Sequence, residues 1–179
     1  LISLLIVLTL VGMHRVKQIN DGLVSINQVN SVKQRYAINF RGSVHDRAIE
    51  LRDVVLQKDE ADVAAAAATI DRLAEFYAKS AGPLDQLVAE PAYRDVREDA
   101  ILKDIKAIEA RTLPLIVRVR ELRDSGEKTE AHRLLMSEAK PAFTDWLAAI
   151  NRFIDLQEAK NAAIAKEVMA TASGFAMLM

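Results

Sequence analysis

The stretch RVKQINDGLVSINQVNSVKQRYAINFRGSVHDRAIELRDVVLQ, residues 15–57, decides the fold of this chain. It contains no proline and only two glycines. At 100° per residue its apolar side chains fall on one stripe, as in an amphipathic helix. The stripe consists of Ile19, Leu23, Ile26, Ala37, Phe40, Val44, Ala48, Leu51 and Val55. The pattern predicts one helix of about 43 residues, roughly 65 Å long.

A second helix is expected directly after the first. Asp59 is suited to be its N-cap, and an alanine-rich run carries the helix to Lys79. Gly82-Pro83 is expected to interrupt it, because proline lacks an amide hydrogen and clashes with the preceding turn. The segment from there to Pro91 is expected to be broken helix and loop.

Two more helices complete the predicted fold. Apolar residues at helical spacing predict the third from about Tyr93 to Arg123, and Gly126 follows its end. The fourth is expected to begin near Thr129, to bend at Pro141 and to continue into the C-terminal apolar run. Short turns make neighbouring helices antiparallel. The sequence therefore predicts an all-α, up-down-up-down four-helix bundle with two long and two shorter helices.

Both ends of the chain are apolar, over residues 1–14 and 168–179. Neither run reaches the roughly 20 apolar residues that span a bilayer, so we interpret each as the water-side part of a truncated transmembrane helix. A signal peptide is the competing interpretation of the first run, but it does not explain the second. A domain at 15–167, held by both ends on one side of a membrane, is placed to report something across it. Charge alone does not fix which side it faces.

Composition narrows the function classes. The net charge of −1 argues against nucleic-acid binding, which needs a strongly basic surface. The chain has no cysteine and no Glu-x-x-His pair, which excludes disulfides, thiolate metal sites and a di-metal bundle centre. No nucleophile–base pair, paired-carboxylate cleft or phosphate loop is visible, so neither catalysis nor a cofactor or metal is expected.

This arrangement resembles the periplasmic sensor domain of bacterial methyl-accepting chemotaxis receptors, the four-helix-bundle family that includes the aspartate receptor. The segment Arg41–Asp53 is similar to the arginine-bearing end of that family's first helix, and Ala139–Thr144 to its proline-containing ligand segment. Arg47 and Arg52 match the spacing of the first two ligand-binding arginines of the aspartate receptor, whereas Leu56 stands at the third position. The resemblance implies a homodimer in the bacterial inner membrane, a periplasmic sensor domain, a cytoplasmic output module and signalling by a small displacement of the fourth helix.

Cationic side chains flank the apolar stripes of the first and third helices. On a helical wheel two arginines and a histidine on the first helix, Arg41, Arg52 and His45, fall within about 40° of one another, and Arg111 and Arg118 on the third fall within about 20°. Such a cluster is costly unless an anion joins it, and a di- or tricarboxylate can do so through bidentate guanidinium pairs. The alternative is that these arginines extend along the surface and pair with acidic residues of their own helix. The candidate ligand-binding residues are Arg41, His45, Arg47, Arg52, Arg111, Thr112, Arg118 and Thr144.

The predicted function is that of a chemoreceptor sensor domain for a small organic acid such as malate or citrate. The expected partners are this ligand, a second copy of the chain and the membrane through both ends. Two alternatives stay open: a membrane-anchored helical scaffold without a ligand, and the sensor domain of a histidine kinase or a cyclase.

Overall fold

The computed structural model describes residues 2–176, except the side chains of residues 4, 175 and 176. It divides into two compact units, each described here by itself. The central unit comprises residues 35–154, and the terminal unit pairs the residues up to 34 with those from 155 onward.

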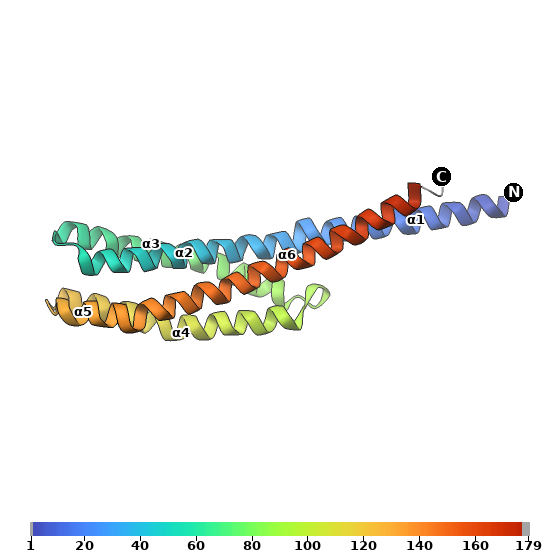
Figure 1. Ribbon diagram of the computed structural model, residues 1–179. Helices are drawn as coiled ribbons and strands as arrows, with labels where there is room; N and C mark the ends of the chain where they lie inside the picture. The colour runs from blue at the N-terminus through green and yellow to red at the C-terminus, as the bar shows by residue number, and fades with distance from the viewer. Residues whose placement is uncertain (1, 177–179) are drawn as a thin grey trace. The chain divides into compact units, whose positions relative to one another are not determined.

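Every element of the described chain is a helix (Figure 1). In chain order the elements are α1 (Ile2–Val24), the π-helical η1 (Ser25–Asn30), α2 (Ser31–Leu56), α3 (Glu60–Ala89), the 3₁₀ turn η2 (Pro91–Tyr93), α4 (Val96–Asp124), α5 (Lys128–Leu134), the π-helical η3 (Leu135–Ala139) and α6 (Lys140–Ala176). The first three elements follow one another without a break, as do the last three. The chain therefore forms four helical segments, which confirms the predicted all-α four-helix bundle.

The second helix continues through Pro83, where the sequence predicted an interruption. α3 ends at Ala89, and both Leu84 and Val88 beyond the proline are buried. A proline inside a helix costs about 3 kcal/mol, whereas burying an aliphatic side chain stabilises by about 1.5–3 kcal/mol. Two such side chains outweigh the lost hydrogen bond, so the predicted break at Gly82-Pro83 is wrong.

The boundaries of the third helix follow from local capping. α4 begins at Val96 rather than at the predicted Tyr93, which belongs to η2. The Asp95 carboxylate accepts a hydrogen bond of 3.0 Å from the amide of Arg97, which makes Asp95 the N-cap. At the other end Gly126 has a φ of 82°, a conformation that favours glycine, and it follows the last turn of α4 as predicted.

Two π-helical segments interrupt the regular helices, where the apolar periodicity predicted continuous α-helix. The second, Leu135–Ala139, lies directly before Pro141. Pro141 has no amide hydrogen to donate to the Ser137 carbonyl four residues earlier, so the regular ladder cannot continue there. The irregularity expected at Pro141 therefore takes the form of a π-helical segment.

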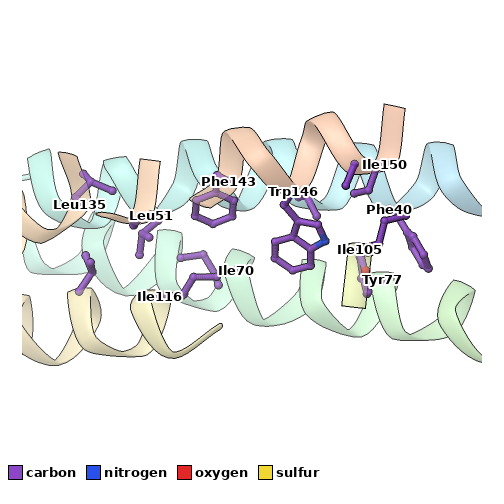
Figure 2. Packing of buried hydrophobic residues seen from close by; sticks show 14 of the residues in the cluster. Phe40, Leu51, Ile70, Tyr77, Ile105, Ile116, Leu135, Phe143, Trp146 and Ile150 are labelled. Atoms are coloured by element: carbon purple, nitrogen blue, oxygen red, sulfur yellow. The ribbon is translucent and has the colours of Figure 1, made fainter. Parts of the chain in front are cut away.

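The core of the central unit is built from aromatic and aliphatic side chains of several helices (Figure 2). The Phe40 ring stacks on Tyr77 with centroids 4.0 Å apart, and Tyr77 meets Trp146 edge-on at 5.5 Å. Because these rings come from α2, α3 and α6, they fix the three helices at one common level. Aromatic pairs of this kind are worth about 0.5–1.5 kcal/mol beyond their burial.

In the terminal unit α1 packs closely against α6. A Cβ added to Gly22 would lie 2.5 Å from Cγ2 of Val168, so the α1 backbone leaves no room for a side chain at this position. In the same unit, Nε2 of Gln34 on α2 donates a hydrogen bond of 3.0 Å to Oε1 of Glu158 on α6. Close backbone approach therefore marks the α1–α6 contact, and a side-chain hydrogen bond joins α2 to α6.

The predicted membrane segments coincide with the first part of α1 and the last part of α6. None of the described helices has a stretch both long and apolar enough to cross a bilayer. Residues 1 and 177–179, the outermost parts of the two predicted segments, lie outside the described residues.

Candidate ligand-binding groove

A groove of about 300 Å³ lies on the central unit between α2 and the wall formed by η3 and α6. We call it the α2–α6 groove. Its lining residues are His45, Ala48, Ile49 and Arg52 from α2, Leu135 and Met136 from η3, and Lys140, Phe143, Thr144 and Leu147 from α6.

Helix geometry aligns these side chains. The four from α2 and the four from α6 share the spacing i, i+3, i+4, i+7, so each set lies along one face of its helix. Two such faces side by side leave a furrow between them. Leu135 and Phe143 are almost completely buried and form its floor, while Arg52 and Lys140 are exposed at its rim.

The rim of the groove is cationic. The side chain of Arg52 is 57% exposed, and its Nε lies 3.9 Å from Asp53, too far for a hydrogen bond. Nδ1 of His45 lies 3.0 Å from Oδ1 of the neighbouring Asp46. No acidic residue is among the lining residues. A ligand at this rim would therefore meet positive charge from both helices without competing carboxylates in the lining.

Thr144 adds a hydroxyl to the rim. Its Oγ1 donates a hydrogen bond of 3.1 Å to the carbonyl oxygen of Lys140 in the preceding turn. The hydroxyl hydrogen is thus engaged, and the oxygen lone pairs can accept a further hydrogen bond.

The structure brings three predicted site residues together in the groove: His45, Arg52 and Thr144. Lys140 joins them, although the sequence analysis did not select it. The available signal was its place within the proline-containing segment Ala139–Thr144.

Arg47 lies in the core rather than at the groove. Its side chain is 2% exposed, and its guanidinium carbon lies 5.2 Å from the Tyr77 ring centroid and 4.8 Å from that of Trp146. The Tyr77 hydroxyl donates a hydrogen bond of 3.2 Å to Oε2 of Glu109. Burial is the main cause of three shifts: it lowers the pKa of Arg47 and raises the pKa values of Tyr77 and Glu109.

The other predicted site residues also lie outside the groove lining. Arg111 forms an ion pair with Asp145 on α6, and Arg118 forms one of 3.3 Å with Glu121 on its own helix. The Arg118 pair matches the alternative in which arginines pair with acidic residues of their own helix, whereas Arg111 pairs across to α6.

Thr112 and Arg41 differ in their exposure. Thr112 is fully buried, and its hydroxyl donates to the carbonyl oxygen of Ile108 at 2.7 Å. Arg41 is exposed on α2. Over the described part of the chain, no group of three or more His, Asp or Glu side chains is arranged to hold a metal ion.

Comparison with known families places this geometry in context. A family model described as a four helix bundle sensory module for signal transduction matches residues 1–172. A search of curated proteins gave no match to the chain. The family is one of signal-transduction modules and not of enzymes, and its architecture is the one seen in Figure 1. The chain therefore belongs to the family of four-helix-bundle sensory modules for signal transduction.

Proposed function

We propose that this module is the sensor domain of a bacterial chemoreceptor and that it binds a small organic acid in the α2–α6 groove. The observation that carries the proposal is the cationic rim: Arg52 and Lys140 line the groove, and no acidic residue does. Guanidinium and ammonium groups bind carboxylates through charge-assisted hydrogen bonds, which are about twice as strong as neutral ones. Di- and tricarboxylates of the malate and citrate type carry the charge that this rim can neutralise.

Ligand binding at this position links two helices. Arg52 belongs to α2 and Lys140 to α6, so an acid held by both favours the arrangement in which they are close. A ligand shifts a conformational equilibrium only by its differential affinity for the two states. We infer that the signal is a small displacement of α6 relative to α2, carried along α6 toward a membrane segment and an output module.

A homodimer fits the exposed face of α2. Positions 38, 42, 45, 49, 52 and 56 alternate in steps of four and three, the spacing of a coiled-coil seam. Ile38 is 45% and Leu56 57% exposed, and Gly42 has open space around it. Two copies of α2 packed along this seam would cover these apolar side chains, and because His45, Ile49 and Arg52 also line the groove, each groove would lie in the interface. The same proposal places the protein in the bacterial inner membrane, with this sensor domain in the periplasm.

Calorimetric titration of the purified full chain with malate and citrate tests the acid site. Arg52→Ala should weaken binding tenfold or more, because losing one charged hydrogen-bond partner costs about 1.5–3 kcal/mol. Arg118→Ala is the matched control, since Arg118 is equally exposed but lies outside the groove. If Arg118→Ala or Arg111→Ala weakens binding and Arg52→Ala does not, the acid binds on α4 and the groove assignment is wrong.

A further inference from the structure

The α2–α6 groove is chemically different at its two ends and in its middle, and this order restricts the shape of the acid that fits it. Arg47 on α2 lies against Trp146 on α6, and the two helices run in opposite directions (Figure 1). Arg52 is five residues further along α2, and Lys140 is six residues back along α6. The two cations therefore lie at about the same level and flank one end of the groove.

Apart from the Thr144 hydroxyl, the middle of the groove is apolar. Ile49 lies almost one turn before Arg52 on α2, at about the level of Phe143 and Thr144 on α6, and Ala48 extends the apolar surface. Apolar surface removed from water here contributes about 25 cal/mol per Å². A charged group resting on this surface would lose its hydration without a partner. The middle therefore favours a hydrocarbon chain or ring.

The far end of the groove is polar again. His45 lies two turns from Arg52 on the same helix face, a separation of about 10 Å along the helix axis. Leu147 lies opposite it on α6, and Nδ1 of His45 lies 3.0 Å from Oδ1 of Asp46. This end offers an imidazole but no fixed cation.

We propose that the recognised ligand is an elongated dicarboxylate with an apolar middle. One carboxylate lies between Arg52 and Lys140, the hydrocarbon covers Ile49 and Phe143, and the second carboxylate reaches His45. This inference rests on the proposed function and narrows its ligand class. Malate and citrate are too compact to reach both ends and would place a second carboxylate over the apolar side chains of the middle. An amino acid would bring its ammonium group beside cations, with no acid in the lining to receive it.

Calorimetric titration of the purified full chain with pimelate, heptanoate and malate tests the proposal. Pimelate has two terminal carboxylates on a hydrocarbon chain, heptanoate has one carboxylate on a chain of the same length, and malate is compact and hydroxylated. We expect pimelate to bind at least tenfold more tightly than malate, with heptanoate between them. Malate binding as tightly as pimelate would overturn the elongated-ligand inference.

Variants locate each end of the ligand. Arg52→Gln should weaken pimelate and heptanoate alike by tenfold or more, whereas His45→Ala should weaken pimelate and leave heptanoate unchanged. Ile49→Ser should weaken pimelate and heptanoate but not malate. Arg41→Gln is the control, because Arg41 is exposed on the same helix and does not line the groove. If His45→Ala weakened the binding of pimelate and heptanoate equally, the second carboxylate would not lie beside His45.

The proposed function and this inference fail in different ways. Suppose that malate or citrate binds, that Arg52→Gln abolishes this binding, and that pimelate binds no more tightly. The groove is then an acid site, but the ligand is not an elongated dicarboxylate. If neither pimelate, heptanoate, malate nor citrate binds, both proposals fail. Circular dichroism melting of each variant identifies any loss of affinity that comes from loss of fold.

Discussion

The guanidinium carbon of Arg47 lies 4.8 Å from the ring centroid of Trp146, so a cation is packed against an aromatic ring inside the bundle core. Its Nε donates a long hydrogen bond of 3.4 Å to the Ser43 carbonyl oxygen, and its buried Nη2 has no hydrogen-bond partner within the described chain. Desolvating a charge costs several kcal/mol, and the two cation–π contacts, to Tyr77 and Trp146, each return about 2 kcal/mol. Burial is still the largest influence, because it lowers the pKa of Arg47. We infer that Arg47 does not stabilise the fold by its charge.

The first prediction follows from that balance. Arg47→Met keeps most of the side-chain volume and removes the charge, so its free energy of unfolding should be unchanged or higher by about 1–3 kcal/mol. Arg47→Ala should be less stable than Arg47→Met by about 2–5 kcal/mol, because it leaves a cavity. Urea unfolding followed by circular dichroism measures both. A marked loss of stability in Arg47→Met would show that the aromatic contacts outweigh desolvation.

The second prediction concerns pH and Glu109. Burial raises the pKa of Glu109 in the folded state above its usual value, so the folded state binds its proton more tightly than the unfolded chain does. Ionisation therefore lowers stability as pH rises through the folded pKa. Glu109→Gln should be more stable than the wild type at pH 7, and the difference should vanish below about pH 4, where the carboxyl is protonated in both states.

Urea unfolding at several pH values measures this difference. Glu75→Gln, at an exposed position of α3, serves as the control and should show no comparable pH-dependent gain. A Glu109→Gln variant that is no more stable than the wild type at pH 7 would mean that the ionised carboxylate is well accommodated beside Tyr77.

The third prediction concerns the close approach of α1 to α6. Gly22→Ala should destabilise the helix pair, because the new Cβ meets Cγ2 of Val168, whose branched side chain has little freedom to move. The clash costs about 1–3 kcal/mol, more than the gain of up to about 1 kcal/mol from replacing glycine in a helix. Adding Val168→Ala should restore the stability that Gly22→Ala loses. Gly42→Ala, which has open space, should be neutral or stabilising.

Thermal unfolding of the single and double variants, at a protein concentration too low for association, tests this contact. A double-mutant cycle with no coupling between positions 22 and 168 would show that the helices separate easily at this point.

The fourth prediction concerns assembly. Ile38→Asp should prevent dimer formation along the α2 seam, since it places a charge among the exposed apolar residues that the dimer would bury. Its melting temperature as a monomer should change little, because Ile38 is already 45% exposed. Val117→Asp on α4, where Val117 is 53% exposed, is the control and should leave association unchanged.

Sedimentation velocity with and without saturating acid measures this equilibrium. If the ligand bridges two protomers, it must shift the wild type toward dimer by mass action. An acid that binds without changing the monomer–dimer distribution over a tenfold concentration range would place the whole site within one protomer.

Part of the candidate site could be predicted from spacing on a single helix. His45 and Arg52 are seven residues apart, which places them on one face of α2, and the structure brings both into the groove. Arg52 and Arg47 are only five residues apart, and helical periodicity puts them on different faces. Their assignment to one site came from the family resemblance, and packing separates them.

The sequence by itself determined the class of fold, because helix formation, capping and amphipathic faces depend on residues close together in the chain. The stripe that includes Phe40 and Leu51, the cap at Asp59 and the turn at Gly126 all act within a few residues. Only the tertiary structure decided how each helix is rotated against its neighbours. The rotation is set by the burial of apolar side chains over the whole core. The same packing buries Arg47, keeps α3 helical beyond Pro83 and sets Lys140 opposite Arg52. A helical wheel gives the angles around one axis, but not the direction in which the neighbouring helix lies.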